Sequence, residues 1–242
     1  MKTSKPLSLL SSLLTALAVL SGSIAAPLLC RPFYYAHIGP MGLAEYVGLT
    51  PEQIRQAFDQ VMDFCLGLRP DFAAGVLPWS QSGADHFADV RRLFLLDLWV
   101  LGLSLAGLLC LLVYSRFKRV RPYCFRGRGP GFWAAAGLAI VFLAVGGLAA
   151  LNFDRAFVLF HALFFPGKTN WLFDWRTDPI ILFMPEEFFR NCALLILALL
   201  LMWCAVLILA DSWARRKRRA AARGAGCPGC CPPLQSEKER EK

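Results

Sequence analysis

Residues 157–189, FVLFHALFFPGKTNWLFDWRTDPIILFMPEEFF, connect two long apolar segments and are themselves rich in phenylalanine and tryptophan. A water-soluble protein rarely leaves so many aromatic side chains in a connecting loop. In a membrane protein such side chains settle where lipid headgroups meet hydrocarbon. His161 lies in the middle of the phenylalanine-rich part. The stretch therefore indicates a partly immersed, outward-facing loop that the rest of the chain supports.

The rest of the chain has the composition of a membrane protein. Of its 242 residues 57% are hydrophobic, and they gather in blocks instead of recurring at a helix or strand period. Four blocks have about the 20 residues that cross a bilayer core: 7–29, 93–114, 132–151 and 192–210. We therefore expect an all-α membrane protein, a four-transmembrane-helix bundle formed by one domain, residues 1–210.

The distribution of basic residues predicts the topology. The N-terminus, the loop 115–131 and the segment from residue 211 hold 17 of the 26 lysines and arginines. By the positive-inside rule these segments are cytoplasmic, and the loops 31–92 and 152–190 form an extracytoplasmic cap. The positive net charge thus reflects topology and anionic lipid, and no motif supports nucleic-acid binding. No feature of the sequence assigns an oligomeric state.

The first apolar block fits two interpretations. Lys2 and Lys5 precede an apolar run, and residues 23–25 resemble a signal-peptide cleavage site. The run continues to Leu29, however, which is long enough to cross a bilayer. We favour a retained anchor, because it gives an even number of crossings and both termini on one side.

Two further helices are predicted in the outer loops. Thr50 can form a capping box with Gln53, and apolar side chains follow at helical spacing as far as Cys65. The phenylalanine spacing over residues 153–164 predicts a second helix, which Pro166 ends. We expect residues 170–178 to be irregular and Pro185 to open the last spanning helix.

The nine cysteines do not predict a metal site. Cys227, Cys230 and Cys231 form a CxxCC motif without a second half-site, and the others are scattered. We expect residues 211–242 to be a basic, cysteine-containing cytoplasmic tail without fixed structure. We expect no metal and no cofactor, and the chain has no Walker loop, GxGxxG or GxSxG motif.

The histidines are the best candidates for chemistry. All three, His37, His86 and His161, fall in the expected outer loops, and the last two adjoin different spanning helices. If the second spanning helix begins near Ser82, His86 and Asp89 share a helix face. The pair suits proton transfer near the membrane surface. Structural hydrogen bonding is the alternative reading of the pair, and we assign His37 to it.

Several motifs together resemble the bacterial lipoprotein intramolecular transacylases. They are HFADVR at 86–91, FHALFF at 160–165, NWLFD at 170–174, Asp178, and PEEFF at 185–189. The likeness covers about residues 7–210 in order and topology and leaves out the cysteine-bearing tail. This family moves the sn-2 acyl chain of a diacylglyceryl-cysteine onto that cysteine's own α-amine, which gives a lyso-form lipoprotein.

The resemblance implies a diacylated lipoprotein substrate in membrane lipid and two catalytic histidines, His86 and His161. It implies supporting roles for five further residues: Asp89, Arg91, Asn170, Trp171 and Asp178.

The chemistry suits these residue types, because a tethered amine is itself the nucleophile of the ester aminolysis. The histidines can divide the proton transfers, Asp89 can orient His86, and Arg91 or Asn170 can face the developing charge. Two alternatives stay open. One is an interfacial lipid or ester hydrolase that uses the same histidines with water as nucleophile. The other is a non-catalytic membrane scaffold in which the histidines hold loops in place.

Reporter fusions test the expected topology. Reporters fused after Tyr114 and after Ala210 are expected on the cytoplasmic side, and one near Gly75 on the outer side, because basic loops stay inside. Alkaline phosphatase and a fluorescent protein at each position give opposite readings. An outer location of the fusion at Ala210 would contradict the model of four crossings.

Overall fold

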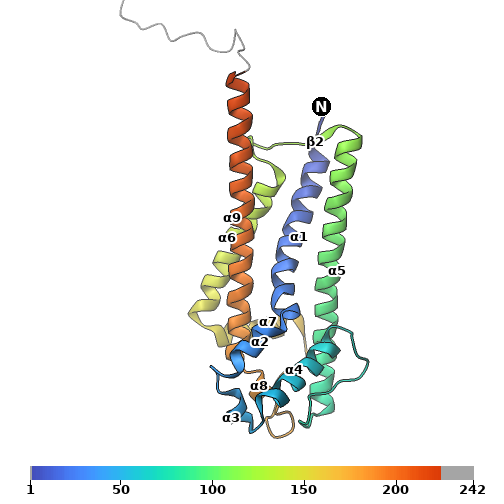
Figure 1. Ribbon diagram of the computed structural model, residues 1–242, viewed down its shortest axis with the longest axis vertical. Helices are drawn as coiled ribbons and strands as arrows, with labels where there is room; N and C mark the ends of the chain where they lie inside the picture. Colours follow the sequence, from blue (N-terminus) through green and yellow to red (C-terminus); the bar gives the residue numbers. More distant parts are fainter. Residues whose placement is uncertain (1, 225–242) are drawn as a thin grey trace, which may run out of the picture.

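The protein is a bundle of four long helices with a layer of short helices at one end (Figure 1). The computed structural model describes residues 2–224. The long helices are α1 (Lys5–Leu29), α5 (Gln81–Phe117), α6 (Pro130–Leu151) and α9 (Glu186–Gly224). All four are long and apolar enough to cross a membrane, which confirms the expected mostly helical architecture with four long apolar helices.

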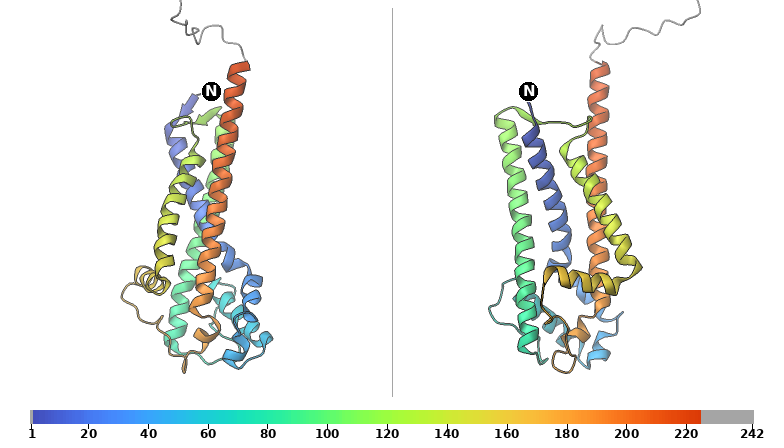
Figure 2. Two further views of the ribbon diagram at one scale, coloured as in Figure 1. Left: turned by 90° about the vertical axis from the view of Figure 1, so that its left-hand side faces the viewer. Right: turned by 180° about the vertical axis from the view of Figure 1, so that it is seen from behind.

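Helix α1 is the central element of the bundle. It packs against α5, α6 and α9, and α6 and α9 also pack against each other (Figure 2). The α6–α9 contact is tight enough to bury Ala135, Leu200 and Cys204. On the outside, large apolar side chains such as Trp99 and Ile140 are more than two thirds exposed. This outer surface suits lipid, because hydrocarbon solvates apolar side chains and helices satisfy their own backbone polar groups.

Four short helices form a cap at one end of the bundle: α2 (Arg31–Ile38), α3 (Leu43–Val47), α4 (Pro51–Cys65) and α8 (Ile180–Phe183). Helix α4 confirms the predicted capping box. The hydroxyl of Thr50 accepts a hydrogen bond from the backbone N–H of Gln53 at 3.2 Å. The side-chain oxygen of Gln53 accepts one from the backbone N–H of Thr50 at 2.9 Å.

One apolar core joins the two expected outer loops within the cap. The ring of Tyr34 in α2 stacks on Phe58 of α4 at 3.7 Å. The Tyr34 hydroxyl donates a 2.6 Å hydrogen bond to the backbone oxygen of Phe183 in α8. Both Tyr34 and Phe183 are almost completely buried. The side of the membrane on which this cap lies stays a prediction.

Helix α7 (Phe153–Phe164) runs across the bundle next to the cap instead of along it (Figure 2). Asn152 caps its first turn by accepting a hydrogen bond from the backbone N–H of Arg155 at 2.9 Å. Its exposed side is apolar, and Leu159 and Leu163 are 69% and 70% exposed. Residues 165–179 then connect α7 to α8 by turns and irregular chain, as predicted.

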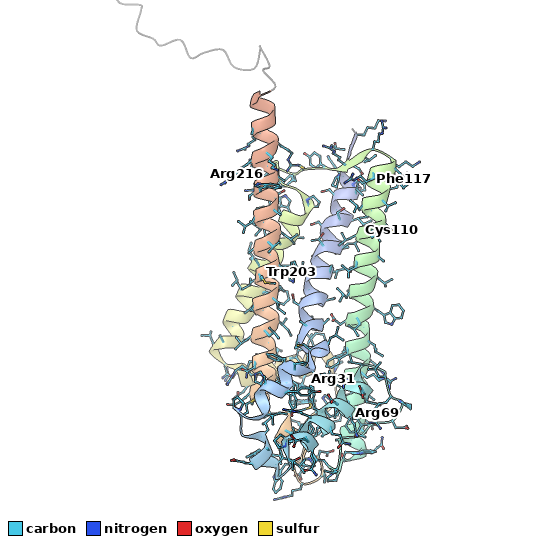
Figure 3. The ribbon with its side chains drawn as sticks, viewed as in Figure 1. Arg31, Arg69, Cys110, Phe117, Trp203 and Arg216 are labelled. Carbon is cyan, nitrogen blue, oxygen red and sulfur yellow. The ribbon has the colours of Figure 1, made fainter. Side chains whose placement is uncertain are left out.

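The opposite end of the bundle holds a small sheet that the sequence did not reveal. Strand β1 (Lys2–Ser4) pairs in parallel with β2 (Val120–Pro122). Figure 3 shows Arg216 and Phe117 at this end, and Arg31 and Arg69 at the cap end.

The expected disordered tail begins as a helix instead. We expected no fixed structure from residue 211 onward, but residues 211–224 continue α9. The alanine, arginine and lysine residues of this segment favour helix. Arg128 also anchors its first residues, because its guanidinium donates hydrogen bonds to Asp211 at 3.2 Å and to Ser212 at 2.8 Å. The CxxCC motif at 227–231 lies outside the described residues.

Candidate active site

Two buried histidines from different elements meet beside the cap. His86 is 5% exposed and lies in the second turn of α5, while His161 is 7% exposed and lies in α7. Their ring centroids are 5.9 Å apart, and the ring planes differ by 29°. The fold thus brings together the two histidines that the sequence singled out. His37 lies in α2, where its ring packs on Phe33 of the same helix.

Aromatic rings enclose the histidine pair. Phe165 and Phe173 each make a T-shaped contact with the ring of His86, with ring centroids 5.1 and 5.4 Å apart. The indole of Trp171 stacks on His161 at 4.4 Å. These rings come from the loop that follows α7, so this loop covers both imidazoles with apolar surface.

The hydrogen bonds of the two rings differ. Nδ1 of His161 lies 2.8 Å from the backbone oxygen of Phe157, which can only accept, so this nitrogen carries the hydrogen. In the neutral ring the lone pair is therefore on Nε2. Nδ1 of His86 is buried and has no hydrogen-bond partner among the described residues.

Burial keeps both imidazoles neutral at physiological pH. His86 precedes the apolar run of α5 that starts at Leu93, and α7 crosses the bundle, so both rings lie outside the spanning segments. Burial and the neighbouring His161 lower the pKa of His86 to about 4. Burial also lowers the pKa of His161, outweighing its hydrogen bond to the oxygen of Phe157.

Asp89 is the centre of an ionic cluster beside the pair. Its carboxylate accepts hydrogen bonds from Lys168 at 2.5 Å, Arg92 at 3.2 Å and Asn170 at 3.4 Å. Burial alone would raise the pKa of Asp89, but the bonds from Lys168 and Asn170 and the nearby positive charges lower it overall. We expected Asp89 to orient His86. Its hydrogen bonds instead hold the loop after α7 against α5.

Arg91 points away from the histidines. Its guanidinium donates to the backbone oxygen of Arg69 at 3.2 Å and lies over the ring of Phe64 at 5.1 Å. Arg91 therefore fastens α5 to the segment that follows α4. Arg91 and Asn170 were the two groups expected to face the developing charge. Only Asn170 lies on the side of α5 that faces the histidine pair.

Asp178 fixes the start of α5. It is 4% exposed, and its carboxylate accepts hydrogen bonds from the backbone N–H of Ser80 at 2.7 Å and the hydroxyl of Thr177 at 2.9 Å. Ser80 in turn caps the helix by accepting from the backbone N–H of Gly83 at 3.0 Å. A Cβ atom at Gly83 would lie 2.4 Å from the Asp178 carboxylate, so only glycine fits there.

An open, polar pocket lies next to the pair, between the first three turns of α5 and residues 167–170. Ser82, Asp85 and Arg92 line it from the helix, and Thr169 lines it from the loop. Asp89, Lys168 and Asn170 also line it. Asn170 directly precedes Trp171, which stacks on His161, so the same loop contributes to the polar pocket and to the surroundings of His161.

Gly83 and Lys168 were not singled out from the sequence, and Phe165 and Phe173 were quoted only as parts of the motifs at 160–165 and 170–174. Lys168 did carry a signal, because it is the one basic residue between Arg155 and Arg176. Among the described residues no group of three or more His, Cys, Asp or Glu side chains could hold a metal ion.

Comparison with known proteins identifies relatives of this chain. The model of a protein family described as "Lipoprotein intramolecular transacylase Lit" matches residues 9–189. A comparison with curated proteins finds no match.

The fold also matches solved structures. An in meso structure of the membrane integral lipoprotein intramolecular transacylase Lit from Bacillus cereus is 24% identical, with a TM-score of 0.79 over 89% of this chain and 97% of that one. Two further structures of the Bacillus cereus protein carry a histidine replaced by arginine or by alanine. They are 23% identical, with TM-scores of 0.73 over 89% of this chain and 93% or 94% of theirs.

The close approach of Gly83 to Asp178 predicts a destabilised variant. Gly83→Ala is expected to break the contact between α5 and the loop, at a cost of about 1–3 kcal/mol, because the added methyl group overlaps the carboxylate. Thermal unfolding in detergent measures the effect. Gly102→Ala is the matched control, because Gly102 lies in the same helix and a Cβ atom there would meet nothing within 4 Å. Equal melting temperatures for the two variants would contradict the proposed contact.

The burial of the pair predicts a titration below the ordinary range. An exposed imidazole is half-protonated near pH 6.5, about its reference pKa. Because burial lowers the pKa of His86 and His161, both rings are expected to stay neutral as the pH falls through that value. Ring signals of ¹⁵N-histidine-labelled protein, assigned with single His→Gln variants, report the midpoints. Half-protonation of either ring at or above pH 6.5 would contradict the buried site.

Proposed function

The chain belongs to the lipoprotein intramolecular transacylase family Lit. From this premise we propose that it moves the sn-2 acyl chain of a diacylglyceryl-cysteine lipoprotein onto that cysteine's own α-amino group, with His161 as general base and acid and His86 as a hydrogen-bond donor to the oxyanion. The observation that carries the proposal is the buried pair itself, with ring centroids 5.9 Å apart and the loop after α7 covering both rings.

The reaction is an ester aminolysis within one molecule. The amine nitrogen bonds to the sn-2 acyl carbon, and the bond from that carbon to the glyceryl oxygen breaks. The amine loses one proton and the glyceryl oxygen gains one, so the products are an amide and a free hydroxyl group. Because the amine and the ester belong to the same substrate, the enzyme contributes orientation and proton transfer instead of a nucleophile of its own.

His161 is suited to act as the general base. Its Nδ1–H is held by the backbone oxygen of Phe157, so the lone pair of Nε2 is free to take the amine proton. The resulting imidazolium then returns this proton to the departing glyceryl oxygen. Stacking on Trp171 holds the ring plane during both transfers. Trp171 thus acts as a positioning residue.

His86 is suited to stabilise the oxyanion. With a pKa lowered to about 4 it remains neutral, and a neutral imidazole still carries one N–H that can donate to the developing negative charge. Phe165 and Phe173 exclude water around it, which strengthens this electrostatic contact. Asp178 positions His86 through the first turn of α5.

The acyl chains have an apolar approach to the pair. His161 lies on α7, whose outer side exposes Leu159, Phe160 and Leu163. We propose that α7 lies at the outer leaflet, with both termini of the protein in the cytoplasm, so that the lipid part of the substrate enters along this side. The aromatic cover over the pair favours transfer over hydrolysis, because it limits water as a competing nucleophile.

Replacing either histidine is expected to remove most turnover. His161→Gln is expected to lower the rate about a hundred- to ten-thousand-fold, the usual range for general acid–base assistance. His86→Gln is expected to lower it about a hundred- to thousand-fold, the usual range for loss of one oxyanion donor. The assay is mass spectrometry of a diacylated lipopeptide incubated with the purified protein. It distinguishes acyl on the α-amine from released fatty acid.

His37→Gln is the matched control. His37, like His161, has its Nδ1 next to the backbone oxygen of the residue four positions earlier, at 2.7 Å. We expect this variant to keep near-normal turnover. Release of fatty acid without any N-acylated cysteine would assign the site to hydrolysis. Normal N-acylation by both site variants would leave the histidines with a structural role only.

A further inference from the structure

We propose that the polar pocket binds the polypeptide that follows the lipid-modified cysteine, as an extended and uncharged main chain. The inference rests on the proposed function, because it assigns the second half of the same substrate. It gives the pocket a role in substrate specificity that the acid–base chemistry does not require.

The substrate has two chemically different parts that diverge at the reacting amine. The acyl chains need apolar surroundings, which α7 offers through Leu159 and Leu163. The polypeptide leads into water and needs hydrogen-bonding partners. The polar pocket is lined by Asp89, three residues from His86, and by Asn170, the neighbour of the Trp171 that stacks on His161. The junction between lipid and polypeptide thus falls at the histidine pair, with one suitable environment on each side.

The pocket offers both donors and acceptors, as a peptide main chain requires. Arg92 and Lys168 present N–H groups, and Ser82, Asp85 and Thr169 present oxygen atoms.

The charges of the pocket favour a neutral ligand over a lipid phosphate. Arg92 and Lys168 both bond to the carboxylate of Asp89, which balances one of their two positive charges. Asp85 adds a second negative charge, so the charges of these four side chains sum to zero, and its carboxylate accepts a hydrogen bond from the side-chain amide of Gln81 at 2.9 Å. A phosphate here would lie against two carboxylates, whereas an uncharged main chain meets no repulsion.

Small residues leave room for a main chain. Ser82 and Ala88 line the helix side of the pocket, and Gly167 lines the loop side. Gly167 has a φ of +73°, a conformation that residues with a Cβ atom rarely adopt. The loop can therefore pass close to a bound peptide without a side chain between them.

Two synthetic substrates test the proposal with the full-length protein in nanodiscs. One is diacylglyceryl-cysteine followed by four uncharged residues, and the other is diacylglyceryl-cysteine amide without further residues. The wild-type protein is expected to prefer the long substrate in kcat/KM. Ser82→Trp fills the pocket and Arg92→Ala removes a donor. Each is expected to reduce this preference about tenfold, mainly through KM, as the loss of one or two hydrogen bonds would.

Arg190→Ala is the matched control for Arg92→Ala. Both arginines pair with an acid three residues earlier on a helix, Arg92 with Asp89 and Arg190 with Glu187, but Arg190 does not line the pocket. The control is expected to keep the wild-type preference. Equal kcat/KM for both substrates in the wild type would overturn the proposal, as would equal losses on both substrates in the pocket variants.

Binding of unreactive analogues separates this proposal from the proposed function. Replacing the sn-2 ester by an ether blocks acyl transfer, so the affinities of long and short analogues report the pocket alone. Tighter binding of the long analogue, lost in Ser82→Trp, supports the pocket even if no N-acylated product is ever formed. Competition by phosphatidylglycerol vesicles in the wild type but not in Arg92→Ala would assign the pocket to a lipid phosphate and overturn the proposal.

Discussion

The carboxylate of Asp178 is buried between two segments that lie far apart in the sequence, and it satisfies the backbone of Ser80 at the very start of α5. A buried carboxylate is stable only when hydrogen bonds replace its lost hydration. This requirement fixes the loop after α7 against the first turn of α5. His86 follows in the next turn, and the same loop supplies Trp171 to His161. The geometry of both histidines therefore depends on this contact, which the bonds of Asp89 to the same loop reinforce.

The site combines a dry centre with a charged rim. Phe165 and Phe173 surround His86, while Lys168 and Asp89 form an ion pair at the side of the polar pocket. A dry centre keeps the imidazoles neutral, and in the proposed reaction it strengthens their hydrogen bonds to the substrate. A charged rim holds the covering loop in place without exposing the centre to water. The two environments are adjacent because one short loop contributes to both.

Most of the helices could be predicted because their signals are local. The four apolar blocks, the capping box at Thr50 and the phenylalanine spacing before Pro166 each depend on neighbouring residues. The site could be predicted only in part. Asp89 and Arg91 lie two positions apart on α5, hence about 200° around the helix, so they cannot both face the histidines. The contact between Lys168 and Asp89 depends on the path of a loop, which no local pattern specifies.

The crossing direction of α7 links the site to the thickness of the bilayer. His86 belongs to a helix that continues through the spanning bundle, whereas His161 belongs to one that lies across it. Spanning helices respond to a thicker or thinner hydrocarbon layer by tilting, while a helix at the interface follows the lipid surface. Such a change alters the height of one imidazole relative to the other. In the proposed reaction, lipid chain length thereby becomes a variable that acts on the reacting geometry itself.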